Sequence, residues 1–131
     1  FKSNDDGQSW QKIRLPYAGS MFGLLSLGGE KVLAFGLRGN VLESLDAGAS
    51  WSKVGRGTGT SLIGGTVTED GSVVLVGGNG TLVVRKPGAS SFSARSIQLK
   101  SGQNPAFSAA APSANGVLLT SDLGAVNTSV Q

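Results

Sequence analysis

One stretch of the sequence decides the fold: Ser44-Leu45-Asp46-Ala47-Gly48-Ala49-Ser50-Trp51. Its pattern, S-x-D-x-G-x-S-W, also occupies residues 3–10, and the two octets are 41 residues apart. A further 41 residues along the chain, Ser91 and Phe92 occupy the last two positions of the pattern, without its Asp and Gly. A repeat of this length predicts a chain built from repeated supersecondary units.

The residue types in the octet predict a β-hairpin turn. The Asp accepts hydrogen bonds from nearby backbone N–H groups, the Gly adopts a positive φ, and the Trp buries its indole at the start of the next strand. Such residues serve turns far more often than ligands, so we assign the octets a structural role over an ion-binding or catalytic one. The residues concerned are Ser3, Asp5, Gly7, Ser9 and Trp10 in the first octet, and Ser44, Asp46, Gly48, Ser50 and Trp51 in the second.

Both octets resemble the Asp-box, also called the bacterial neuraminidase repeat. Asp-boxes lie on β-propeller blades of enzymes and of non-enzymes alike. The resemblance therefore implies a fold much more strongly than it implies a function.

Short apolar stretches alternate with glycine-rich turns, which predicts an all-β chain of four-stranded units of about 40 residues, the blades of a propeller. The loop at residues 36–39 recurs at residues 77–80, again with an offset of 41. We expect strands at residues 20–27, 31–35, 40–45, 51–54, 61–67, 72–76, 81–85, 92–99, 107–111 and 117–120, and from residue 125 onward. The units are residues 1–15 (an octet and the outer strand of a first blade), 16–56, 57–99 and an incomplete blade at 100–131.

About three blade equivalents are too few for a closed ring, because propellers typically have four to eight blades. Residues 10–15 form a spare outer strand, and the last unit lacks one. We favour a piece of a longer propeller, with an upstream segment before Phe1 and with Gln131 near its natural end. The alternative is a homodimer that completes a six-bladed ring.

The composition excludes several kinds of catalytic and binding site. The chain of 131 residues has no cysteine and no histidine, which removes thiolate chemistry, the commonest general base and the commonest metal ligand. We expect no cofactor and no metal. The net charge of +3 without a long basic run argues against nucleic acid, and no apolar run is long enough to span a membrane.

Alternate loops of a blade lie on opposite rims of a propeller, so the strand order assigns the loop charges to two sides. We expect one rim to be basic and the other acidic. The first carries Arg38, Arg56, Asn79 and Lys100 with Asp122 as its one acid, and the second carries Asp5, Asp6, Glu30, Asp46, Glu69 and Asp70 opposed by Lys86. We expect the basic rim to bind an acidic partner protein or polar ligand; the alternative is that these are ordinary solvated loop charges.

The residues do not supply a catalytic centre. Sialidases, which share the Asp-box, need an arginine cluster, a Tyr nucleophile with a Glu base, and an acid–base Asp. The one tyrosine, Tyr17, lies beside a proline in a loop, and Arg14 lies on an outer strand. We therefore predict that the chain is not an enzyme.

Residues 32–41 with the octet that follows, echoed by residues 73–84, resemble the photosystem II stability and assembly factor-like propellers. That resemblance implies a non-enzymatic scaffold that binds a protein partner in a periplasmic or otherwise exported location. The alternative is a fragment of an Asp-box glycosidase whose catalytic blades lie outside this chain.

Overall fold

The computed structural model describes residues 1–55 and 57–130, which form three antiparallel sheets. The first sheet has the order β1-β2-β3-β4, the second β5-β6-β7-β8 and the third β11-β10-β9. The strands are β1 (Met21–Gly28), β2 (Lys31–Gly36), β3 (Val41–Ser44), β4 (Ser52–Lys53), β5 (Leu62–Val67), β6 (Val73–Gly77), β7 (Thr81–Arg85), β8 (Ser93–Ser96), β9 (Phe107–Ser113), β10 (Gly116–Ser121) and β11 (Gly124–Thr128). A short 3-10 turn, η1 (Leu37–Gly39), joins β2 to β3.

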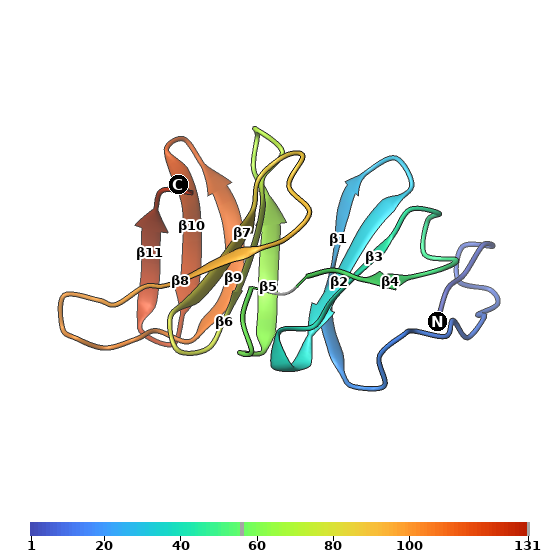
Figure 1. The fold of residues 1–131 in the computed structure, drawn as a ribbon, viewed down its shortest axis with the longest axis horizontal. Coiled ribbons are helices and arrows are strands. Elements are labelled where there is room, and N and C mark those ends of the chain that lie inside the picture. The colour runs from blue at the N-terminus through green and yellow to red at the C-terminus, as the bar shows by residue number, and fades with distance from the viewer. Residues whose placement is uncertain (56, 131) are drawn as a thin grey trace.

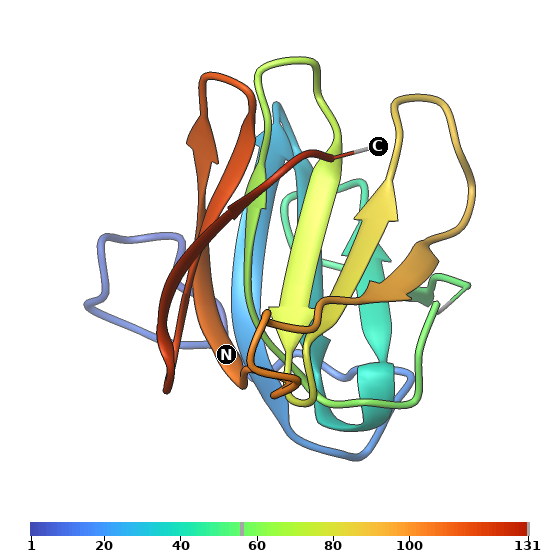
Figure 2. The ribbon, with the colours of Figure 1, turned by 90° about the vertical axis from the view of Figure 1, so that its left-hand side faces the viewer.

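The three sheets follow one another along the long axis of the molecule (Figure 1). Their first strands, β1, β5 and β9, are neighbours in space, whereas β4 and β8 lie on the opposite side (Figure 2). Each sheet is therefore a blade, with its first strand innermost and its last strand outermost. The predicted all-β fold, a partial β-propeller, is confirmed.

Apolar side chains fill the two spaces between the blades. The second sheet is buried on both faces because β6 alternates: Val73 and Leu75 pack toward the first sheet, and Val74 and Val76 toward the third. All four are at most 4% exposed. The cluster between the first two sheets consists of Leu33, Phe35, Val41, Leu62, Val73, Leu75, Val83 and Phe92, and the cluster between the last two of Val74, Val76, Leu82, Val84, Phe107, Val117 and Leu119.

The N-terminal segment departs from the expected outer strand at residues 10–15. There Gln11 alone pairs, in an antiparallel bridge with Lys2 whose two N···O distances are both 2.8 Å. The bridge repeats, with the offset of 41, the pairing of Glu43 with Ser52 between β3 and β4. Residues 1–11 thus have the form of the hairpin between the third and fourth strands of a blade. The bridge at Lys2 and Gln11 is its last pairing, and residues 12–15 have no partner strand in the part of the chain that the structure describes.

The N-terminal segment also lies at the opposite end of the molecule from β9, β10 and β11 (Figure 1). The spare outer strand of the sequence analysis therefore does not complete the last blade within this chain. Among the described residues the last blade has three strands.

Candidate functional site

The second octet closes on itself through its own side chains. The Ser44 hydroxyl donates to Asp46 Oδ1 at 2.8 Å and accepts the N–H of Gly48 at 2.7 Å. The Asp46 carboxylate accepts the Ser50 N–H at 2.9 Å and the Ser50 hydroxyl at 2.5 Å. These donors, the Ser50 hydroxyl first, lower the pKa of Asp46 to about 2.

The first octet repeats this network bond for bond. Ser3 donates to Asp5 and accepts the N–H of Gly7, and Asp5 accepts the N–H and the hydroxyl of Ser9. The hydroxyl and N–H of Ser9 and the hydroxyl of Ser3 lower the pKa of Asp5. Both carboxylates are engaged by their own turn, so the geometry supports a structural use of the octets.

Two features of the octets were not predicted. The residue before each glycine, Asp6 in one octet and Ala47 in the other, also has a positive φ, of 57° and 56°. The indoles are less buried than expected: Trp51 is half-buried, whereas Trp10 is 63% exposed because no inner strands lie beneath it. Each indole nitrogen instead donates to the carbonyl of its own octet glycine, at 3.1 Å for Trp10 and 2.9 Å for Trp51.

A third turn uses the same chemistry without the octet. Between β5 and β6, Asp70 accepts the Thr68 hydroxyl at 2.5 Å and the Ser72 N–H at 3.0 Å. These two groups and the Ser72 hydroxyl lower the pKa of Asp70 to about 2. The sequence signal of this turn is the run T-x-D-G-S at residues 68–72, which lacks the full octet pattern.

The structure places two of the expected basic-rim residues at equivalent positions. Arg38 lies in η1 and Asn79 in the β6–β7 turn, both with a positive φ, of 57° and 54°. The N–H of Arg38 donates to Ser61 Oγ at 3.1 Å, and Asn79 Oδ1 accepts the Asn104 side chain at 2.9 Å. Each loop is therefore bonded to the segment that leads into the next blade, and both loops lie at the lower edge in Figure 1.

The other residues expected on the basic rim are Lys100, Asp122 and Arg56. Lys100 is exposed in the turn between β8 and β9. Asp122, in the β10–β11 turn, accepts the N–H of Ala106 at 2.9 Å. Arg56 lies outside the described residues.

The opposite edge carries the β1–β2 and β5–β6 turns with their acids, Glu30, Glu69 and Asp70. Lys86 lies 4.0 Å from Asp70 and donates to the carbonyl of Val130 at 2.6 Å. This lysine is thereby engaged on its own edge and does not extend the basic rim.

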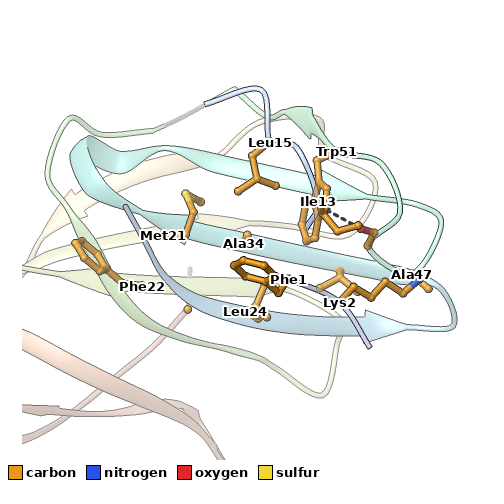
Figure 3. Close-up of a pocket in the computed structure, with 13 residues that line it drawn as sticks. Phe1, Lys2, Ile13, Leu15, Met21, Phe22, Leu24, Ala34, Ala47 and Trp51 are labelled. Carbon is orange, nitrogen blue, oxygen red and sulfur yellow. Dashed lines mark hydrogen bonds between the residues drawn. The ribbon is translucent and has the colours of Figure 1, made fainter. Parts of the chain in front are cut away.

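An apolar groove of about 620 Å³ covers the open face of the first sheet. Its floor comes from β1 and β2, including Leu24 and Ala34, and its other walls from Phe1, Leu15 and Trp51 (Figure 3). Leu24 is 67% exposed. The sequence analysis did not predict a groove, although an open blade face was implicit in the count of three blades.

In the described part of the chain, no group of three or more acidic, His or Cys side chains is placed to hold a metal ion. The same residues contain no helix long and apolar enough to cross a membrane.

These features define a blade-repeat protein of the β-propeller class, and the solved structures that it resembles belong to that class. It resembles the structure described as YCF48 bound to D1 peptide, with a TM-score of 0.62, 18% identity, and coverage of 92% of this chain and 39% of that chain. It also resembles YCF48 from Cyanidioschyzon merolae, with a TM-score of 0.61, 16% identity, and coverage of 91% of this chain and 44% of that one. The chain thus spans about two fifths of these proteins, and identities this low establish the fold alone. No protein-family model and no curated protein sequence matches the chain.

Proposed function

We propose that this chain is part of a non-enzymatic propeller scaffold that binds an acidic segment of a partner protein at its basic rim. The observation that carries the proposal is the equivalent placement of Arg38 and Asn79 in two consecutive blade loops on one edge. A rim of repeated loops can hold an extended peptide across several blades. The resemblance to a propeller that has been solved with a bound peptide supports this role.

The assignments of repeat type, cellular role and location rest on resemblance to known families. We propose that the two octets are Asp-boxes, because their hydrogen bonds repeat one for one in both copies. We also propose an assembly-factor-like role in a periplasmic or otherwise exported location. The alternative proposal is a fragment of an Asp-box glycosidase whose catalytic blades lie outside this chain; within this chain Asp5, Asp46 and Asp70 are each bonded within a turn.

We further propose that a second copy of this chain can act as a partner. The open face of the first sheet presents Val32 and Ala34, which correspond at the offset of 41 to Val73 and Leu75, the residues that the second blade packs against the first. The open face of the third sheet presents Leu118, which corresponds in the repeat to Val74. The two open faces are therefore the two halves of one kind of interface, and two copies of three blades would make a six-bladed ring.

The rim proposal is tested with a fluorescein-labelled decapeptide of glutamates, measured by fluorescence anisotropy at low ionic strength. Replacing Arg38 and Arg56 together by alanine should weaken binding about tenfold, and added salt should weaken binding to the parent protein. The matched control replaces Lys31 and Lys86, on the opposite edge, by alanine and should leave the affinity unchanged. Equal affinity of the arginine variant and the parent would overturn the rim as the binding surface.

A further inference from the structure

The three innermost strands share an irregularity at the same place in each blade. The register of β1 with β2 shifts between Met21 and Gly23, that of β5 with β6 between Leu62 and Gly64, and that of β9 with β10 between Phe107 and Ala109. The extra residues are Phe22, Ile63 and Ser108. A β-bulge re-aims the side chain that it inserts, and a bulge repeated in three blades is a built feature of the fold.

The bulges direct apolar side chains to the surface. Ile63 is 42% exposed although its sheet has a neighbouring sheet on each face and its partner strand, β6, is buried. The exposure of Ile63 therefore arises at the inner edge of the second blade, where β5 is the innermost strand, and not from an uncovered face of the sheet. Phe22, at the equivalent position of the first blade, is 47% exposed and borders the groove on the open face of the first sheet, and Ser108 is exposed in the third blade.

Each bulge lies beside a loop of the basic rim. Ser61, whose hydroxyl oxygen accepts a hydrogen bond from the N–H of Arg38, is two residues before Ile63 in the sequence. Asn104, which donates to Asn79, lies just before the strand that carries Ser108. The loop of one blade is thus hydrogen-bonded to the segment that leads to the bulge of the next blade, both between the first and second blades and between the second and third.

We propose that Phe22 and Ile63 form an apolar step that binds an aliphatic or aromatic side chain of an acidic peptide, while a neighbouring carboxylate of that peptide meets Arg38. The inference rests on the proposed function of the rim and adds its specificity. An apolar side chain gains free energy when it covers exposed apolar surface, and the positive charge beside the step favours a carboxylate next to it. The row ends at Ser108, which is polar, so the apolar preference is confined to the first two blades.

The test compares two fluorescein-labelled acidic pentapeptides in anisotropy titrations against the whole chain. One has the sequence Asp-Leu-Glu-Leu-Asp, and in the other both leucines are serine. We expect the leucine peptide to bind about five- to tenfold more tightly, the effect of about 1 kcal/mol of apolar contact. Ile63→Ser and Phe22→Ser should remove most of this difference and leave the affinity for the serine peptide unchanged.

Two control variants test whether the protein stays folded and whether the effect is specific to the bulge residues. Ile63→Thr keeps the β-branched shape on the bulge and should reduce the leucine preference without changing the circular dichroism spectrum. Leu118→Ser removes an equally exposed apolar side chain, on the open face of the third sheet, and should leave the preference intact.

The outcomes separate the two proposals. If both peptides bind equally and Arg38→Ala weakens both, the rim proposal holds and the apolar step is wrong. If neither peptide binds the parent protein, both proposals are wrong. Retention of the leucine preference in the folded Ile63→Ser and Phe22→Ser variants would also overturn the step.

Discussion

The carboxylate of Glu43 in β3 and the guanidinium of Arg85 in β7 meet at 2.7 Å across the interface between the first two blades. The side chains are 24% and 12% exposed, respectively, so the pair is intermediate between a surface ion pair and a buried one. Arg85 also lies over the ring of Phe92, 5.3 Å from its centroid. The ion pair therefore joins the two blades, while the cation–π contact holds the Arg85 side chain in place within the second blade.

Replacing either partner of this pair should destabilise the protein. We expect Glu43→Gln or Arg85→Met to lower the free energy of unfolding by about 1–3 kcal/mol, between the values for exposed and buried pairs. Urea unfolding followed by circular dichroism measures the change. The double variant should lose less than the two single losses together, and strict additivity would show that the pair contributes no coupling.

Gly39 is expected to resist substitution for two reasons. Its φ is +72°, and an added Cβ would collide with the carbonyl oxygen of Thr58, in the segment that leads to the next blade. Gly29 is the matched control, because its φ is +57° but nothing lies near its missing Cβ. Gly29→Ala should lose about 1–2 kcal/mol of stability through backbone strain alone, and Gly39→Ala at least about 1 kcal/mol more through the clash, both measured by urea unfolding. Equal losses of stability in the two variants would show that the segment around Thr58 can move away from the added Cβ without destabilising the fold.

The repeat made most of the fold predictable. An offset of 41 residues, read from two octets, located the turns, and apolar stretches between glycine loops located the strands of the three sheets. The outer strand predicted at residues 10–15 does not form, because strand pairing needs a partner of matching length and here the pairing is a single bridge between Lys2 and Gln11. Hydrophobic pattern alone does not show whether a partner strand is present.

The candidate site was less predictable than the fold. The predicted strand order placed Arg38 and Asn79 on one edge, because both lie in the loop between the second and third strands of a blade. The exposure of Ile63 could not be foreseen, because the bulge that turns this side chain outward is a register shift between strands. The Glu43–Arg85 pair was missed because it joins two blades whose relative placement the sequence does not specify.

The hydrogen bonds to Asp46 predict a pH-dependent contribution of the octet to stability. The folded pKa, about 2, lies below the ordinary value of 3.8, so the ionised carboxylate stabilises the fold at pH values above 3.8. This stabilisation is lost as the pH falls through 3.8 toward 2. We expect Asp46→Asn to be less stable than the parent at pH 7, with the difference shrinking between pH 4 and pH 2.

Urea unfolding midpoints measured from pH 7 to pH 2 give this difference directly. Glu69→Gln, at an exposed turn on the same edge, is the control and should follow the parent throughout. A difference between Asp46→Asn and the parent that stays constant with pH would indicate that the charge is immaterial and that only the shape of the side chain matters.

The two open faces of the chain predict a specific pattern of self-association. Leu24 on the first sheet is 67% exposed and Leu118 on the third is 42% exposed, and in a two-copy ring each would be covered by the other copy. Leu24→Asp and Leu118→Asp should each turn a dimer into a monomer, because a charge would be buried in both interfaces of the ring. Light scattering across a concentration series measures the molar mass.

Mixing the two variants distinguishes this head-to-tail ring from other dimers. In a mixed ring one interface carries both aspartates, while the other joins an unaltered first-sheet face to an unaltered third-sheet face. The mixture should therefore recover dimer that neither variant forms alone, held by the one intact interface. A dimer formed by two first-sheet faces would instead be broken by Leu24→Asp, unaffected by Leu118→Asp and not restored by mixing. A monomeric parent chain at all concentrations would show that the open faces do not bind each other.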